Sequence, residues 1–423
     1  MQPNSYARND NLMTHWRSKA ETWAEALLEF LLMALILIAP FEKHTAQILD
    51  TAIYGSLGVL AVILVARGRS GRMSTPLDIP IFALFLIAVL SAIFSVDGLM
   101  SLASIKRTMV KIWIVYYLFI YAATGIERIK RLIFTYLIGS VAVSSYGILA
   151  FLDGSGVIDG RAHSTFYHPT RLANYMTFAV SISFCLVAYY RESRAIKSVL
   201  YAIFGLSSIC LVLTASRGAN LGLLLGFLIV FGPRNRRLWA VIAVIIALTI
   251  AIIPFQSSHL HFLKGAELVS AKTNISAILG ERQYLWLSGL EMAKDHPILG
   301  IGYGRTFNSL YQSDYAKPEA GQDHSSAHNV IIEVALEMGI FGLAAFMWLH
   351  VLIFREGFQL VRSRPPKVSF ARTLATGVLV ALFAIACNGM VNYFYKDRLI
   401  LVYWFFVAII FALRRLQVRE FGA

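Results

Sequence analysis

The sequence has few cysteines and few charged residues, and both shortages narrow the class of protein. Its 3 cysteines, Cys185, Cys210 and Cys387, all fall inside long apolar runs. There they are expected to behave as small apolar residues, so no disulfide framework is predicted. Charged residues make up 15% of the 423 residues and apolar residues 57%. This balance is typical of a membrane protein with many spans and not of a soluble domain.

Several catalytic signatures are also missing. No Asp-x-Asp motif is present that could hold a metal-bound nucleotide sugar. His324 and His328 stand four residues apart, but this HSSAH segment lacks the glutamate of a zinc protease, and no third ligand follows at a telling spacing. Gly300, Gly302 and Gly304 do not lie between a strand and a helix, which disfavours a dinucleotide loop and favours a tight turn leading back to the helices. We therefore predict no metal and no cofactor.

Long apolar runs dominate the rest of the chain. Segments of about 20 apolar residues are long enough to cross a bilayer, and about twelve are predicted. They cover residues 26–40, 46–66, 77–95, 108–124, 132–152, 172–190, 199–215, 221–232, 238–254, 329–354, 373–394 and 399–413. The expected fold is all-α and polytopic. It places nine membrane helices in residues 1–253, a large outer loop in 254–328, and three helices with a cytoplasmic tail in 329–423.

The distribution of positive charge predicts the orientation of these helices. Alternate loops are basic, around residues 67–72, 128–131, 191–197, 234–237 and 355–372, and both ends of the chain also carry Arg or Lys. The positive-inside rule assigns these loops and both termini to the cytoplasm, which an even number of spans requires. The net charge of +14 is then explained by topology and by contact with anionic membrane lipids, and no nucleic-acid partner is predicted. Residues 1–21 lack the apolar run of a cleaved signal peptide, so the first span is expected to remain as an anchor.

Five arginines, with several lysines, remain on the predicted outer face: Arg161, Arg171, Arg217, Arg282 and Arg305. One interpretation is that each long side chain reaches from a helix end to the lipid headgroups. The other is a site for a lipid-linked anion, because guanidinium groups bind phosphate oxygens in a bidentate manner. Arg217 is the strongest candidate because it interrupts two apolar runs at a predicted tight turn. We expect Gly218 to permit the sharp backbone of this turn, and Ser216 or Asn220 to cap a helix end.

The outer loop contains one predicted amphipathic helix that begins near Arg282. From Glu281 to Lys294, apolar residues recur at helical spacing, and the helix is expected to lie on the membrane or against the bundle. The apolar stripe consists of Leu285, Trp286, Gly289, Leu290 and Ala293. Proline disfavours helical geometry in the preceding residue, so the Asp-His-Pro sequence at 295–297 should end this helix.

His328 is the candidate general base. Ser325 and Ser326 are good helix N-caps, which places His328 in the first turn of the membrane helix that begins near Asn329. The positive end of the helix dipole disfavours a protonated ring, and a neutral imidazole can accept a proton. The alternative is that this histidine only caps the helix or contacts headgroups.

The ordered set of motifs resembles the O-antigen ligase and polymerase superfamily of bacterial inner-membrane proteins. The matching segments are STFYHPTRLANY at 164–175, TASRG at 214–218, residues 282–302, and His328-Asn329 followed by Glu333, Glu337 and GIFG at 339–342. His168 and the Asp-Arg pair at 397–398 match less distinctively. Together the matches cover roughly residues 160–342.

This resemblance implies a metal-independent glycosyltransferase of the GT-C type. The enzyme would transfer a glycan from undecaprenyl diphosphate to lipid A–core oligosaccharide at the periplasmic face. His328 would be the general base, and Arg217 and Arg282 would bind the diphosphate, assisted by Arg161 or Arg171. An O-antigen ligase is our first interpretation and a polymerase of the same superfamily the second. A flippase for lipid-linked glycans and an enzyme that glycosylates proteins are further alternatives.

Overall fold

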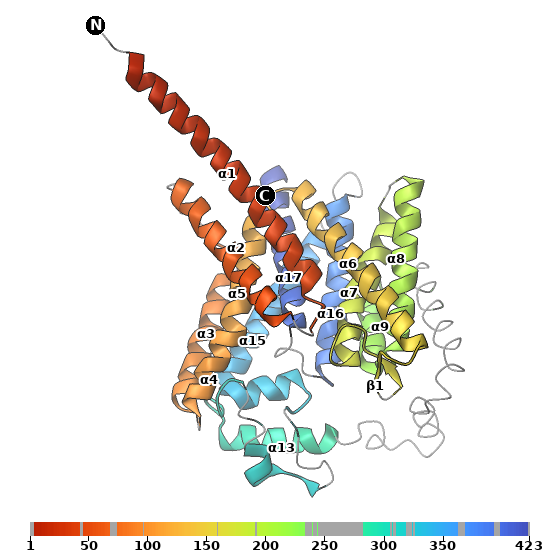
Figure 1. Ribbon diagram of the computed structural model, residues 1–423. Helices are drawn as coiled ribbons and strands as arrows, with labels where there is room; N and C mark the ends of the chain where they lie inside the picture. Colours follow the sequence, from red (N-terminus) through yellow and green to blue (C-terminus); the bar gives the residue numbers. More distant parts are fainter. Residues whose placement is uncertain are drawn as a thin grey trace.

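The apolar runs of the sequence form a bundle of long helices in the computed structural model (Figure 1). The structure describes residues 4–421, apart from 43–44, 68–73, 96, 159, 191–192, most of 233–281, 305–306, 308–309, 319–323, 325, 363–368 and 393–397. Within these residues the helices are α1 (Asn4–Ile38), α2 (Ala46–Arg67), α3 (Asp78–Ile93), α4 (Gly98–Ser104), the π-helix η1 (Ile105–Val110), α5 (Lys111–Ala122), α6 (Ile126–Leu152), α7 (Pro169–Tyr189), α8 (Arg194–Leu213), α9 (Arg217–Phe231), α13 (Arg282–Asp295), the π-helix η3 (Tyr311–Tyr315), α15 (Val330–Arg362), α16 (Phe370–Gly389) and α17 (Leu399–Phe421). Strands β1 (Val157–Ile158) and β2 (Arg161–Ala162) form an antiparallel hairpin.

The prediction of a helical membrane protein with several spans is confirmed. Seven helices of the described part are long and apolar enough to cross a membrane: α2, α6, α7, α8, α15, α16 and α17. The helices α3 and α9 are apolar but shorter. The ninth predicted span, residues 238–254, lies almost wholly outside the described residues, so the count of twelve stays a prediction.

The fourth predicted span begins earlier in the structure than its hydropathy suggested. Helices α4, η1 and α5 follow one another from Gly98 to Ala122, whereas the prediction began at residue 108. Asp97 explains the difference, because its Oδ1 accepts a hydrogen bond from the backbone N–H of Met100 at 2.9 Å. A carboxylate in this position satisfies a free N–H of the first turn and so starts the helix before the apolar run begins.

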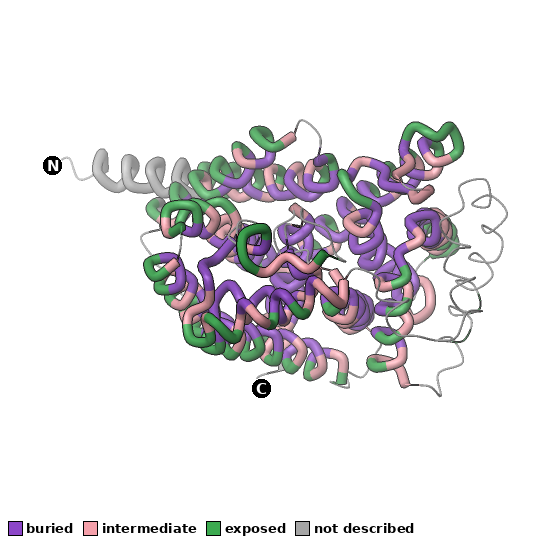
Figure 2. Tube along the Cα trace, turned by 90° about the horizontal axis from the view of Figure 1, so that it is seen from below, coloured by how far each residue is buried: buried purple, intermediate pink, exposed green. Residues whose placement is uncertain are grey.

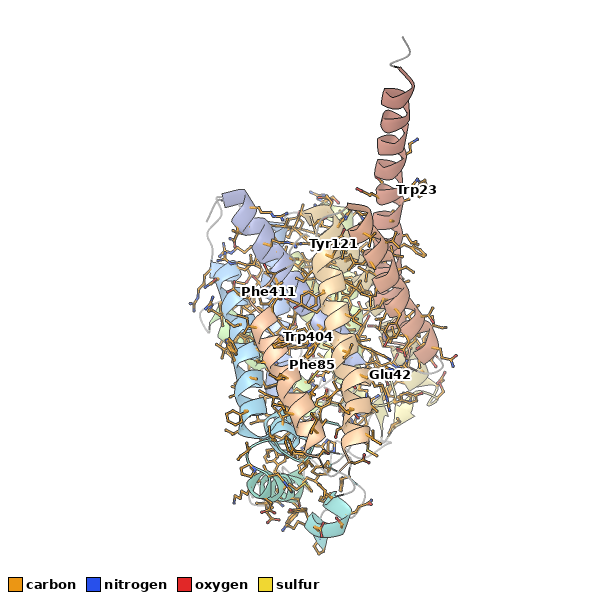
Figure 3. All side chains as sticks on the ribbon, turned by 90° about the vertical axis from the view of Figure 1, so that its left-hand side faces the viewer. Trp23, Glu42, Phe85, Tyr121, Trp404 and Phe411 are labelled. Atoms are coloured by element: carbon orange, nitrogen blue, oxygen red, sulfur yellow. The ribbon has the colours of Figure 1, made fainter. Side chains whose placement is uncertain are left out.

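Aromatic side chains fill the space between α3, α5 and α17. The ring of Tyr116 on α5 lies edge-on to Trp404 and Phe411 of α17, with centroids 5.5 and 6.3 Å apart. Phe85 of α3 makes a similar contact with Trp113 of α5 at 5.3 Å. Figure 3 labels Phe85, Trp404 and Phe411; Trp404 and Phe411 are buried, and Phe85 is partly buried against the core. Viewed along the bundle, the buried positions gather between the helices and many exposed ones lie on its rim (Figure 2).

Helices α9 and α16 approach each other closely along a row of glycines. A Cβ atom added at Gly222 would lie 2.4 Å from the backbone oxygen of Ala384, and one at Gly226 would lie 2.4 Å from the oxygen of Val380. Only glycine fits at such a distance. Small residues of this kind allow membrane helices to pack backbone against backbone. The close contact fixes α9, and with it the position of Arg217 at its start.

Replacing Gly222 with alanine should therefore destabilise the protein by about 1–3 kcal/mol, because the added methyl group meets a backbone atom that cannot move away. Gly205 on α8 is the matched control, since an added Cβ there meets nothing within 4 Å. Gly205→Ala should leave stability unchanged or raise it slightly. Thermal unfolding of both variants in the same detergent measures the difference. Equal unfolding temperatures for the two would contradict close packing of α9 on α16.

Different structural elements lie at the two ends of the bundle. In Figure 1, α1 begins and α17 ends at the upper end, whereas the β-hairpin, α4 and α13 lie at the lower end. Within α13 the buried residues are Leu285, Ser288, Gly289 and Met292, which pack toward α15. The predicted amphipathic helix is thus present and ends at Asp295 as expected. Leu290 of the predicted stripe is 45% exposed, so the packed face is rotated away from it.

The segment after α13 folds back onto a bend in α15. The bend is at Gly339, which has a φ of 65°, and a Cβ there would lie 2.1 Å from the oxygen of Ile298. Ile301 N–H donates to the oxygen of Leu336 at 2.8 Å, and Ile340 N–H donates to Pro297 at 2.9 Å. The three glycines at 300, 302 and 304 all have positive φ angles. The predicted tight turn is therefore confirmed, and it anchors the outer segment to a membrane helix.

Candidate functional site

His328 lies just before α15, and not within its first turn as predicted. The helix begins at Val330, and Asn329 is its cap, because Asn329 Oδ1 accepts hydrogen bonds from the N–H groups of Ile331 and Ile332 at 2.9 and 3.3 Å. The expected capping by Ser325 or Ser326 is therefore wrong. His328 has a φ of 52°, in the left-handed region that few non-glycine residues adopt. The histidine is held in a strained turn directly above the helix.

Two buried glutamates of α15 hold this turn and the neighbouring outer segment. Glu333 Oε2 accepts a hydrogen bond from the N–H of Ala327 at 2.7 Å, one residue before His328. One turn further along, Glu337 Oε1 accepts from the N–H of Gly304 at 3.0 Å. Both glutamates are almost completely buried. Hydrogen bonds to buried carboxylates are strong, so the backbone around His328 is fixed from within the membrane helix.

The surroundings of His328 keep its ring neutral. Its pKa is lowered to about 4, first by burial and then by the nearby positive charges of Arg282, His324 and His168. The prediction of a neutral imidazole agrees with this, although the main cause is burial and not the helix dipole. At neutral pH the ring can accept a proton, as a general base must.

Arg282 interacts with this histidine and also with Arg217, which comes from a different element. Arg282 is the first residue of α13 and Arg217 the first of α9. Burial and the charge of Arg217 both lower the pKa of Arg282, so the two guanidinium groups repel each other. Neither forms an ion pair with a carboxylate among the described residues. Two close, uncompensated cations favour a bound anion between them.

The turn that presents Arg217 differs from the expected one. Ala215 has the positive φ of 47°, whereas Gly218 is helical. The role of Gly218 is close packing, because a Cβ there would lie 2.3 Å from Oδ1 of Asn388 on α16. Ser216 occupies the N-cap position, but its side chain makes no capping hydrogen bond. Arg217 is thus fixed by the contact between α9 and α16.

The other two predicted arginines have structural partners. Arg161 on β2 donates from Nε to the backbone oxygen of Thr214 at 2.8 Å, which ties the hairpin to the turn before Arg217. Arg171 on α7 donates to Glu42 Oε2 at 2.9 Å, and Glu42 is only 1% exposed. Figure 3 shows Glu42 where the chain leaves α1. The charge of Arg171 is therefore balanced, unlike those of Arg217 and Arg282.

Replacing Arg171 with alanine should reduce stability by about 2–4 kcal/mol, because the buried carboxylate of Glu42 then loses its partner. The double variant with Glu42→Gln should recover most of this loss, since no charge remains. Thermal unfolding in detergent measures the effect, and binding of a polyprenyl diphosphate is measured in parallel. A loss of binding of more than about tenfold with unchanged stability would assign Arg171 to the anion site instead.

Two residues near the site, His168 and Asn392, have little or no signal in the sequence. His168 caps α7 by accepting from the N–H of Thr170, and its charge acts on His328. Its proximity had no local signal, since 160 positions separate the two histidines. Asn392 accepts a hydrogen bond from Arg282 Nη2 at 3.3 Å and was not singled out at all. Among the described residues, no three His, Cys, Asp or Glu side chains are grouped as a metal site requires.

Comparison with known proteins agrees with this arrangement. Residues 202–347, from α8 to α15, match the family described as O-antigen ligase, and this range contains Arg217, Arg282 and His328. The chain is 24% identical to an O-antigen ligase of Pseudomonas aeruginosa over 319 residues, 74% of this chain and 73% of that protein. It is 27% identical over 163 residues to the exopolysaccharide production protein ExoQ of Rhizobium meliloti, 36% of this chain and only 35% of ExoQ. These matches confirm the resemblance to the O-antigen ligase superfamily that the motifs indicated.

Proposed function

We propose that this protein is a glycosyltransferase that moves a glycan from undecaprenyl diphosphate to lipid A–core oligosaccharide. The observation that carries the proposal is the neutral imidazole of His328 near the guanidinium group of Arg282, which in turn interacts with that of Arg217. Neither arginine forms an ion pair with a carboxylate among the described residues. Similarity to a protein named O-antigen ligase over 74% of the chain supports the same chemistry. Seven helices that are long and apolar enough to cross a membrane support a reaction on lipid-linked substrates.

In the proposed reaction, the acceptor hydroxyl oxygen forms a bond to the anomeric carbon of the donor. The bond between that carbon and the diphosphate oxygen breaks, and its electron pair leaves with undecaprenyl diphosphate. The hydroxyl proton passes to a ring nitrogen of His328. Arg217 and Arg282 bind the diphosphate and stabilise the negative charge that develops as it departs. Arg161 supports the turn that carries Arg217.

The charge distribution supports an outward-facing site in the bacterial inner membrane. Arg128 and Arg131 at the start of α6, Arg362 at the end of α15, and Arg414 and Arg415 near the end of α17 all belong to one end of the bundle (Figure 1). The positive-inside rule assigns this end, with both termini, to the cytoplasm. His328 and α13 lie at the opposite end, which would then face the periplasm and form an outer domain between residues 254 and 328.

The experiment that tests the proposal is reconstitution of the purified protein in lipid vesicles. Undecaprenyl-diphosphate-linked glycan and lipid A–core are supplied without nucleotide and with a chelator. Capped lipopolysaccharide is the expected product on a gel. Wild-type protein that gives no product, or product that forms equally well with His328→Ala, would refute the proposed reaction.

A second candidate function is favoured by the match to ExoQ, which is named for exopolysaccharide production. A polymerase would use the same donor site but add one lipid-linked glycan to another. It would lengthen the lipid-linked chains when lipid A–core is left out of the vesicles. Leaving lipid A–core out of the same assay therefore distinguishes the ligase from the polymerase.

A further inference from the structure

The C-terminal end of α16 contacts all three elements of the candidate site. Asn392 accepts from Arg282 of α13. Met390 O accepts a hydrogen bond from Asn329 Nδ2 at 3.0 Å, next to His328. Gly218, next to Arg217, packs against the amide of Asn388. The end of α16 thus connects three segments that lie far apart in the sequence.

Three asparagines form a continuous chain of hydrogen bonds from this end of α16 into the bundle. Arg282 Nη2 donates to Asn392 Oδ1 at 3.3 Å, and Asn392 Nδ2 donates to Asn388 Oδ1 at 2.8 Å. Asn388 Nδ2 then donates to Asn174 Oδ1 on α7 at 2.7 Å. Asn174 and Asn388 are each only 1% exposed, so the inner half of the chain is buried in the bundle.

The guanidinium group of Arg282 determines which way each hydrogen bond of this asparagine chain runs. Arginine only donates hydrogen bonds, so Asn392 must present its oxygen to Arg282 and its nitrogen to Asn388. The same orientation is then imposed on Asn388 and Asn174. At the inner end, the buried Nδ2 of Asn174 has no hydrogen-bond partner in the part of the chain that the structure describes. An unpaired buried donor is destabilising. This unpaired donor at the inner end follows from the orientation that Arg282 imposes at the outer end of the hydrogen-bond chain.

The side-chain partner of Arg282 is neutral, whereas that of Arg171 is a carboxylate. Arg171 contacts the carboxylate of Glu42, which cancels its charge. An asparagine oxygen orients a guanidinium group equally well but leaves its positive charge available. We infer that Asn388 and Asn392 are positioning residues that orient Arg282 and Arg217 toward a polyprenyl diphosphate while preserving both positive charges. The inference rests on the donor site proposed above.

The test compares two replacements of Asn392 by the binding of undecaprenyl diphosphate without glycan to the purified full-length protein. Asn392→Ala removes the acceptor, whereas Asn392→Asp keeps an acceptor of the same shape and cancels the charge of Arg282. Binding should weaken a few-fold in N392A and on the order of 10-fold more in N392D. Aspartate also lacks the N–H that Asn392 donates to Asn388, so an effect that comes only from this lost hydrogen bond would persist when Arg282 is absent.

Two further variants separate local from general effects. Gln312→Glu, on the exposed surface of η3, adds the same negative charge in the same outer segment and should leave binding within about twofold of wild type. In an Arg282→Ala background, N392D should have no additional effect, because the charge that it cancels is gone. An undiminished effect of N392D in that background would overturn the inference.

The outcomes distinguish this inference from the proposed function. If wild type binds, Arg282→Ala weakens binding, and N392D binds as well as N392A or better, only the inference is refuted. If wild type does not bind, or Arg282→Ala binds normally, the donor site itself is wrong and both proposals are refuted. Thermal unfolding identifies a variant that does not fold. In that case N392S, which keeps a neutral acceptor, should bind more tightly than N392L, and equal binding would overturn the inference.

Discussion

Replacing His328 with alanine is expected to lower the transfer rate by about 10²- to 10⁴-fold, because the acceptor hydroxyl then has no group to receive its proton. Binding of undecaprenyl diphosphate should change little, since the two arginines remain. The rate is measured in the vesicle assay, and binding separately with the same protein. Retention of more than a tenth of the wild-type rate would show that His328 is not the general base.

The neighbouring histidine and the pH dependence provide the controls. His324→Ala removes an imidazole four residues away and should cost less than about tenfold in rate, because the base itself remains. The pKa of His328 in the free enzyme is lowered to about 4. The neutral form therefore predominates above this pH, and transfer efficiency should fall as the pH decreases through about 4 and not already near 6.5. A wild-type profile that falls at 6.5 would contradict the burial of this ring.

Replacing Arg282 with alanine should lower transfer by about 10²- to 10³-fold, because one of two groups that stabilise the departing diphosphate is lost. The defect should appear both in binding of undecaprenyl diphosphate and in the rate at saturating donor. Arg282→Lys keeps the charge but loses the planar fork, so its activity should lie between those of alanine and wild type. Rates and donor concentration curves in vesicles measure both effects.

The same replacement should also change the pH profile. Arg282 is the first charge, after burial, that lowers the pKa of His328. Without it, the ring becomes easier to protonate, and the acidic limb of the residual activity should move upward from about pH 4 toward the ordinary value for histidine. Arg171→Ala is the matched arginine control and should leave the position of this limb unchanged. An unshifted limb in Arg282→Ala would place Arg282 too far from His328 for the proposed site.

Much of the fold is predictable because it depends on local composition. The apolar runs at 132–152, 172–190, 373–394 and 399–413 coincide with α6, α7, α16 and α17, since only helices satisfy their backbone within lipid. The early start at Gly98 was missed because hydropathy does not register a single capping carboxylate such as Asp97. The bend of α15 at Gly339 was also missed, because it depends on contact with the turn at Ile298.

The site was only partly predictable because its contacts are distant in sequence. Arg217, Arg282 and His328 were predicted from their motifs, and in the structure Arg282 interacts electrostatically with each of the other two. The predicted position of His328 within the first turn was wrong, because serine and asparagine are equally good helix caps and Asn329, not Ser325 or Ser326, caps α15. The hydrogen bond that Glu333 accepts from the N–H of Ala327 holds the backbone before the histidine outside the helix. No local pattern shows that Glu42 neutralises Arg171, since 129 positions separate the two.

The short length of α9 determines the depth of the reaction. With 15 residues it is about 22 Å long, whereas the hydrocarbon core of a membrane is about 30 Å thick. In the proposed orientation, Arg217 at its first residue would lie several ångströms beneath the outer headgroups when the other end of the helix is level with the opposite surface. The diphosphate could then reach the guanidinium groups without extracting the polyprenyl tail from lipid. Either the incoming sugar would have to descend to this depth, or the membrane would have to thin around α9.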